Sequence, residues 1–236
     1  MPLPRDVGVV VVAAGRGDRL GGDLPKQFRP IAGVPLLLRA LRPFLAHPDV
    51  ADVIVVLPAE VAGAPPAWLA DLLGERLRAV AGGARRMDSV EAGLGALPAA
   101  ASVVLVHDGA RPFPDPSVIA EVIAAARRGV AAIAAIPLAD TVKESVNGGA
   151  AGHARVVRTV PREGLWRAQT PQGFPRELLD RAYAAARTGG YEGTDCASLV
   201  ERLGGEVLLI PDSVGNFKVT TANDLRLAEA VARPQG

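Results

Sequence analysis

Two cationic side chains follow a small-residue turn near the start of the chain. Four valines at 9–12 run directly into Ala13, Ala14 and Gly15, and Arg19 and Lys26 come soon after. Four consecutive valines predict a strand that is buried on both faces. The small residues leave backbone N–H groups accessible to a phosphate, and two cations there could neutralise a polyanion. The pattern predicts a nucleoside triphosphate site whose candidate binding residues are Ala13, Ala14, Gly15 and Gly17.

Two familiar phosphate-binding loops fit this segment poorly. A Walker loop needs glycine directly before its lysine, but Pro25 precedes Lys26. Gly15, Gly17 and Gly21 resemble a dinucleotide fingerprint only loosely, and the acidic ribose ligand expected about 20 residues downstream is missing. The alternative without function is a glycine turn carrying two solvated cations.

A second group of polar residues ends another apolar run. Residues 103–106 are all aliphatic, and His107, Asp108 and Arg111 follow them. Ligands of open α/β sheets lie at the carboxyl ends of the strands, so we expect Asp108 at the same edge as the first loop. A carboxylate beside a polyphosphate suits Mg²⁺. The alternative is an Asp108 that caps the next turn and pairs with Arg111, while we expect His107 to be packed.

Two weaker candidates complete the set. Gly82 and Gly83 form a turn that opens a helix, so that Arg86 and Ser89 could reach a base or ribose from the first helical turn. Lys218 lies in a short extended run before the last helix. Turns of this kind are common and a single lysine is usually solvated, so these residues alone do not identify a site.

Strand-like runs alternate with amphipathic stretches along most of the chain. This order is typical of an α/β protein with a mostly parallel sheet flanked by helices. We expect strands at 7–12, 53–57, 77–80, 103–106, 130–136 and 206–210, and helices at 36–44, 118–126, 176–187, 195–203 and 221–232. Thr221 and Asp224 match a capping box at the start of the last helix.

One segment departs from this order. Residues 141–167 have no helical period, and valines alternate there with glycine, asparagine and charged residues. We predict a two-stranded arm with 147–149 near its tip. An isolated hairpin is only marginally stable, so the arm should pack on something, such as a second subunit. The alternative is a mobile surface loop.

Composition narrows the class of protein. The 236 residues are 49% hydrophobic and 22% charged, with a net charge of +1. We therefore expect one domain over residues 1–236 with an arm at about 139–166, and neither a nucleic-acid nor a membrane surface. No signal peptide pattern is visible, and the single Cys196 cannot form an internal disulfide, which indicates the cytoplasm. One cysteine and three scattered histidines do not make a zinc site.

Together these segments resemble the 2-C-methyl-D-erythritol 4-phosphate cytidylyltransferases of the non-mevalonate isoprenoid pathway. The similarity runs over nearly the whole chain, and the ordered set of motifs is more specific than the first one, which many sugar-phosphate nucleotidylyltransferases share. The matching motifs are Ala13-Ala-Gly-x-Gly-x-Arg19, Pro25-Lys-Gln27, Gly82-Gly83, Asp88-Ser89, His107-Asp-x-Ala-Arg-Pro112, Asp140-Thr141, Thr159-Val-x-Arg162, Gln169-Thr-Pro-Gln172, Thr194-Asp195 and Lys218-Val-Thr220.

The resemblance implies a Rossmann-like nucleotidyltransferase fold, a homodimer, and Mg²⁺-dependent transfer of CMP from CTP to methylerythritol phosphate. It implies that Arg19 and Lys26 stabilise the transition state and that Asp108 binds Mg²⁺. Thr141, Arg162 and Lys218 would hold the phosphate-bearing substrate, with Thr141 and Arg162 reaching across from the partner's arm. The candidate catalytic residues are thus Arg19, Lys26, Arg162 and Lys218, and the candidate binding residues include Gly82, Arg86, Ser89, Arg111 and Thr194.

Two departures from the family pattern and three alternative functions accompany this resemblance. Ala84 and Gly215 stand where relatives often carry acidic residues, which leaves Asp108 as the metal ligand we name.

The nearest alternative function is the same transfer to ribitol 5-phosphate. A catalytically silent nucleotide-binding protein is disfavoured because Arg19, Lys26, Asp108 and Lys218 are all present. An NAD-dependent oxidoreductase is disfavoured by the missing ribose acid.

Overall fold

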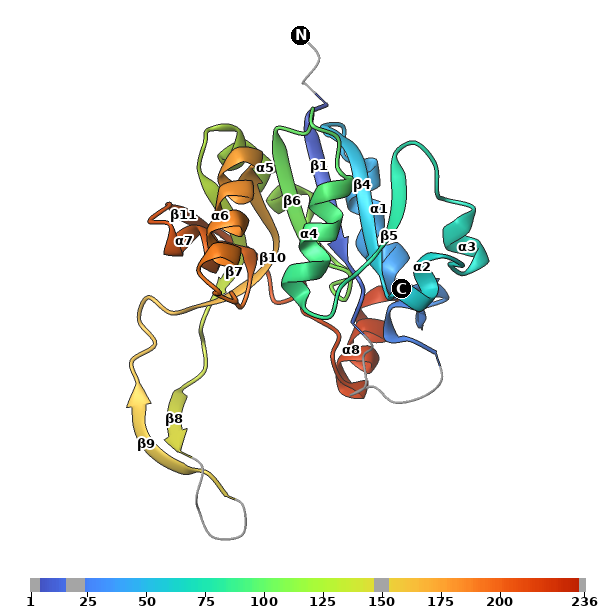
Figure 1. The fold of residues 1–236 in the computed structure, drawn as a ribbon. Coiled ribbons are helices and arrows are strands. Elements are labelled where there is room, and N and C mark those ends of the chain that lie inside the picture. Colours follow the sequence, from blue (N-terminus) through green and yellow to red (C-terminus); the bar gives the residue numbers. More distant parts are fainter. Residues whose placement is uncertain (1–4, 16–23, 147–152, 234–236) are drawn as a thin grey trace.

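The computed structural model describes residues 5–15, 24–146 and 153–233. Within them a seven-stranded sheet forms the centre of the molecule (Figure 1). All of its strands run parallel except β10, which is antiparallel to both neighbours. In spatial order the strands are β11 (Val207–Pro211), β7 (Ala131–Pro137), β10 (Trp166–Pro175), β6 (Val103–Asp108), β1 (Val7–Val12), β4 (Val50–Leu57) and β5 (Leu77–Ala81). The mostly parallel sheet expected from the sequence is confirmed.

Strand β10 was not among the strands predicted from the sequence, yet it lies between β7 and β6 in the central sheet. Its first residue, Trp166, pairs with Pro137 of β7, so the end of the predicted arm belongs to the central sheet. The segment contains Pro171 and Pro175, which disfavour a central strand. The structure accommodates Pro171 because the pairing register with β7 shifts between Ala168 and Gln172, and Pro175 is the last residue of the strand.

Helices cover both faces of the sheet. Helices α1 (Leu36–Ala46) and α5 (Pro116–Arg127) pack on one face, while α4 (Arg86–Ala96), α6 (Arg176–Thr188) and α7 (Cys196–Arg202) pack on the other (Figure 1). The five helices whose ranges were predicted are all present. They are α1, α5, α6, α7 and α8 (Ala222–Ala232).

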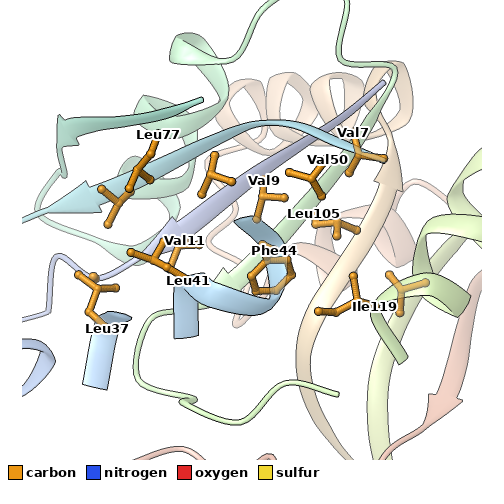
Figure 2. Packing of buried hydrophobic residues seen from close by; sticks show 14 of the residues in the cluster. Val7, Val9, Val11, Leu37, Leu41, Phe44, Val50, Leu77, Leu105 and Ile119 are labelled. Atoms are coloured by element: carbon orange, nitrogen blue, oxygen red, sulfur yellow. The ribbon is translucent and has the colours of Figure 1, made fainter. Parts of the chain in front are cut away.

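Strand β1 is buried on both of its faces, as its valines predict. Val7, Val9 and Val11 lie in one hydrophobic cluster with Leu41 and Phe44 of α1 (Figure 2). Val10 belongs to the cluster on the opposite face. Because β1 is anchored from both sides, the turn that follows it starts from a fixed position.

The remaining elements are short and lie near the ends of the strands. A third hydrophobic cluster joins Ile31 to Val219 and Ala228, and so ties α8 to the segment after β1. The predicted capping box is present, because Thr221 and Asp224 satisfy each other's backbone N–H groups. The short elements are η2 (Lys26–Phe28), β2 (Pro30–Ile31), β3 (Val34–Pro35), α2 (Ala59–Ala62) and α3 (Ala67–Ala70). No helix in the described part of the chain is long and apolar enough to cross a bilayer.

The predicted two-stranded arm is present. Strand β8 (Val142–Val146) pairs antiparallel with β9 (Arg155–Val160), and the pair projects away from the sheet (Figure 1). Val156 and Val157 are 56% and 55% exposed. The predicted tip at 147–149 lies outside the described residues. The described part of the arm therefore presents apolar surface to its surroundings.

Candidate active site

A cavity of about 230 Å³ opens at the carboxyl ends of β1 and β6. Val12 of β1 is the register partner of Asp108 of β6, which brings the first loop and the carboxylate to one edge, as predicted. The cavity is lined by residues from β1, η2, the turn before α4, the end of β6 and the segment before α8. Of the candidate residues, those lining it are Ala13, Ala14, Gly15, Lys26, Arg86, Ser89, Asp108 and Lys218.

Three cations surround Asp108. Arg86 Nη2 lies 3.3 Å from Asp108 Oδ1, while Lys218 Nζ and Arg111 Nε lie 2.9 Å and 3.6 Å from Oδ2. Burial favours the neutral carboxyl, but the charges of Lys218, Arg86 and Arg111 outweigh it and hold the pKa of Asp108 well below its usual range. The carboxylate therefore stays ionised, and the group carries an excess of positive charge suited to a polyphosphate. The ion pair with Arg111 expected in the alternative interpretation is also present.

The turn before α4 packs closely against the first loop because its glycines have no side chains. A Cβ on Gly82 would lie 2.5 Å from Ala14 Cβ and 2.8 Å from Ser89 Oγ. Ser89 is buried, and its hydroxyl accepts the Gly83 N–H at 3.2 Å and donates to Arg85 O at 3.1 Å. Ser89 thus shapes this wall of the cavity as well as lining it.

Arg86 spans the space between Asp108 and the buried Cys196. Its Nη1 lies 3.8 Å from Cys196 Sγ, which also lies 3.3 Å from the Tyr183 hydroxyl. Burial raises the pKa of the Cys196 thiol, so the thiol stays protonated and is no candidate nucleophile. Burial opposes the charge of Arg86, but its neighbours, Asp108 among them, raise its pKa, so the guanidinium stays charged.

Arg111 lies next to the cavity and contacts Asp108 of its wall without lining it. It is buried, and its Nη1 donates to Asn216 O at 2.7 Å in addition to the contact with Asp108. His107 is fully buried against Phe44, with ring centroids 4.9 Å apart, which confirms the expected packing role. Neither side chain lines the cavity.

The remaining candidates lie apart from the cavity or outside the described residues. Thr141 and Arg162 are exposed at the base of the arm, where Arg162 donates a hydrogen bond to Ala139 O. Thr194 is exposed just before α7. None of these three lines the cavity. Gly17 and Arg19 lie outside the residues that the structure describes.

Gln27 is a cavity residue that the motifs contained but that was not among the candidates. Only 1% of its surface is exposed, and neither polar atom of its side-chain amide has a hydrogen-bond partner among the described residues. Its position in the Pro25-Lys26-Gln27 motif could have identified Gln27 as a site residue from the sequence. Arg85 also lines the cavity and pairs with Asp88 at 2.7 Å. Nothing in the sequence distinguished Arg85 from an ordinary solvent-exposed arginine.

The open, mostly parallel sheet and the cation-rich cavity at its carboxyl edge define a Rossmann-like nucleotidyltransferase. Known proteins narrow this class. The family model for 2-C-methyl-D-erythritol 4-phosphate cytidylyltransferase (IspD) matches residues 7–234, and the chain belongs to this family of cytidylyltransferases. The resemblance inferred from the motifs is thereby confirmed.

Individual relatives agree over most of the chain. The 2-C-methyl-D-erythritol 4-phosphate cytidylyltransferase of Acidobacterium capsulatum is 44% identical, with 94% of this chain and 95% of the relative covered. The bifunctional enzyme IspD/IspF of Rhodospirillum rubrum is 45% identical, and the match covers 98% of this chain but 58% of that relative. The crystal structure of the cytidylyltransferase from Thermus thermophilus superposes with a TM-score of 0.78 at 38% identity, covering 99% of this chain and 100% of that one.

Proposed function

We propose that this protein transfers CMP from CTP to 2-C-methyl-D-erythritol 4-phosphate. The products are 4-diphosphocytidyl-2-C-methyl-D-erythritol and pyrophosphate, a step of non-mevalonate isoprenoid biosynthesis. The observation that carries the proposal is the ionised Asp108, which lies among Arg86, Arg111 and Lys218 at the carboxyl ends of β1 and β6. The chain also belongs to the family of cytidylyltransferases that catalyse this transfer.

The chemistry of the transfer needs charge and alignment more than a proton acceptor. A phosphate oxygen of methylerythritol phosphate attacks the α-phosphorus of CTP in line, one P–O bond forms, and the bond to the leaving pyrophosphate breaks. The attacking oxygen is already anionic, so no general base is required. Cations that bring two anions together and stabilise the growing charge carry the catalysis. We assign this role to Lys26 and Lys218, and to Arg19 from its motif.

The walls of the cavity suggest how CTP is placed. The backbone of residues 14–15 lies where a phosphate could approach N–H groups, since no atom of the described residues lies within 4 Å of a Cβ built on Gly15. We place the cytidine against the turn at Gly82 and Gly83, which Ser89 holds in shape. Arg86 then faces the phosphates from the first turn of α4.

We propose Mg²⁺ as the cofactor, with Asp108 as its protein ligand. The described residues contain no cluster of three or more His, Cys, Asp or Glu side chains that could hold a metal. One ionised carboxylate beside a phosphate site fits Mg²⁺, which takes one or two carboxylates together with substrate phosphates and water. When bound, the metal would neutralise charge on the triphosphate. Asp108 would have to exchange Arg86 or Lys218 for the metal, because both of its oxygens are in ion pairs.

We also propose a homodimer in which the arm completes the partner's site. The exposed Val156 and Val157 need a cover, and Thr141 and Arg162 at the base of the arm do not reach the cavity of their own chain. A second subunit would account for both observations. We further propose a cytoplasmic location, with which the free, buried Cys196 agrees.

Pyrophosphate release measures the proposed activity directly. Purified protein is incubated with Mg²⁺, one of the four nucleoside triphosphates, and either methylerythritol phosphate or ribitol 5-phosphate. We expect release with CTP and methylerythritol phosphate, and its loss on addition of EDTA and return with excess Mg²⁺. Release with ribitol 5-phosphate alone would overturn the substrate assignment, and full activity in EDTA would overturn the role of the metal.

A further inference from the structure

A buried threonine of β10 connects the two segments that carry the charged side chains of the cavity. Thr170 Oγ1 accepts the backbone N–H of Asp108 at 3.0 Å and lies 3.0 Å from His107 Nδ1. His107 Nε2 lies 3.1 Å from Arg111 O. Because a carbonyl oxygen can only accept, the neutral imidazole donates from Nε2 to Arg111 O, and its Nδ1 then accepts the hydrogen of the Thr170 hydroxyl. The Thr170 hydroxyl therefore holds one end of the turn from Asp108 to Arg111 directly and the other end through His107.

The backbone of the same threonine holds the second segment. Asn216 Nδ2 donates to Thr170 O at 2.8 Å, and Asn216 O accepts from Arg111 Nη1 at 2.7 Å. Gln169 Nε2 reaches the same Asn216 carbonyl at 3.2 Å. Lys218 follows two residues later and contacts Asp108 Oδ2 at 2.9 Å. The side chain of Thr170 thus faces the Asp108 segment, while its carbonyl faces the Lys218 segment.

The irregular pairing of β10 explains why a side chain takes this place. The antiparallel ladder between β10 and β6 ends where Gln172 pairs with Val106, and the register toward β7 shifts between Ala168 and Gln172. Asp108 lies beyond the last pair of that ladder, so the ladder supplies no backbone acceptor on β10 for its N–H. Bulges of this kind redirect side chains next to active sites. Here the redirected side chain supplies the missing acceptor.

We propose that Thr170 is a positioning residue for nucleotidyl transfer, which acts by holding Asp108 and Lys218 in contact and does not itself touch substrate. The inference rests on the proposed function. His107 fits this arrangement because its Nε2 donates to Arg111 O, which leaves Nδ1 to accept the hydrogen of the threonine hydroxyl. Gln169-Thr-Pro-Gln172 was a motif of the resemblance to which no role was assigned.

Replacing the hydroxyl by a methyl group isolates its contribution. Thr170→Val keeps the shape of the side chain but leaves the Asp108 N–H and His107 Nδ1 unpaired. We expect kcat to fall on the order of ten- to hundredfold, because a small misplacement of charged groups is costly in the transition state. The KM for CTP should change by less than about threefold, because binding groups elsewhere in the cavity are intact. Thr170→Ser retains the hydroxyl and should restore most of kcat.

Two further measurements separate positioning from a general loss of stability. Thr188→Val is the matched control, since Thr188 is exposed on α6 and its hydroxyl donates to Ala184 O within that helix. It should leave kcat at the wild-type value. In a double-mutant cycle with Lys218→Arg, the combined loss should be smaller than the product of the single losses, because both changes act on one contact. Independent, multiplicative losses would overturn the inference.

The outcomes distinguish this inference from the proposed function. If the wild-type protein releases pyrophosphate and folded Thr170→Val keeps wild-type kcat, the positioning role is wrong and the function stands. If the wild-type protein shows no transfer, crystal structures of the wild-type protein and Thr170→Val test the positioning role. An Asp108–Lys218 contact still near 2.9 Å in the variant would overturn the role, and a separated pair would support it. Should the valine variant fail to fold, Thr170→Ala carries the same expectations.

Discussion

At the residue scale, the charge around Asp108 organises the cavity. One carboxylate is shared by Arg86, Arg111 and Lys218, and Lys26 lines the same cavity. The three cations paired with Asp108 are held at the cavity before substrate arrives, and binding of Mg²⁺ to Asp108 would require only Arg86 or Lys218 to move. The mutual ion pairs also offset the cost of burying Asp108 and Arg111.

Lys26 provides a direct test of this charge-based mechanism. Lys26→Ala should fold normally, because the side chain belongs to a cavity wall and not to the core, and kcat should fall about 10²–10³-fold, as for the loss of one oxyanion donor. Steady-state pyrophosphate release measures kcat, and circular dichroism checks the fold. Arg128→Ala, at an exposed position after α5, is the control for removal of a positive charge. Near-wild-type turnover in Lys26→Ala would remove this lysine from the mechanism.

His107 makes stability depend on pH. Burial lowers its pKa from 6.5 to about 4, while Asp108 and Arg111 beside it act in opposite directions. The folded-state pKa is below the unfolded one, so the unfolded chain binds more protons between these values. This contribution is complete above pH 6.5 and is lost as the pH falls toward 4, by about 3 kcal/mol.

Urea unfolding at several pH values between about 4 and 7 measures this loss. In His107→Gln the free energy of unfolding should decline less steeply over that interval than in the wild-type protein. His153→Gln is the matched control, since His153 is exposed and is not part of the core. Equal pH dependence in the wild-type protein and His107→Gln would contradict the assignment.

At the element scale, α4 reaches the cavity because a glycine lets it approach the sheet. A Cβ on Gly93 would lie 2.4 Å from Val10 Cγ1, whereas no atom in the described part of the chain lies within 4 Å of one on Gly95. Gly93→Ala should therefore lower the free energy of unfolding by about 1–3 kcal/mol despite alanine's higher helix propensity. Gly95→Ala in the same helix should raise it by up to about 1 kcal/mol.

Denaturant titration of the two variants compares the same substitution at sites two residues apart. Gly93→Ala should also lower activity, because α4 carries Arg86 and Ser89 into the cavity wall. Gly95→Ala should keep wild-type turnover. Equal stability of the two variants would mean that the approach of α4 to β1 is not limited by this contact.

At the scale of the whole molecule, the arm separates two groups of proposed site residues. Lys218 lines the cavity, whereas Arg162 lies at the base of the arm. If the arm completes the partner's site, Arg162→Ala and Lys218→Ala are each inactive but complement one another. Mixing the two after dissociation should restore about a quarter of wild-type turnover, because half of the dimers have one intact site. No recovery despite subunit exchange, measured by mass spectrometry, would contradict a shared site.

Much of the fold was predictable because hydrophobic patterns are local. The valines of β1 and the apolar faces of α1 and α5 predicted their elements, and the structure confirms them. Strand β10 was not predicted, because Pro171 and Pro175 disfavour a strand and only its two neighbours in the sheet stabilise it there. Its antiparallel direction depends on those neighbours as well.

For the site, sequence alone determined which kinds of side chain are present and at which ends of strands they lie. Lys26 and Asp108 could be assigned to one edge because parallel strands end together. Only the tertiary structure decided that Arg86, Arg111 and Lys218 converge on Asp108, and that Thr170 connects their segments. Most of these contacts join residues that are far apart in the chain, and their distances depend on how the sheet and its helices pack together rather than on any local pattern.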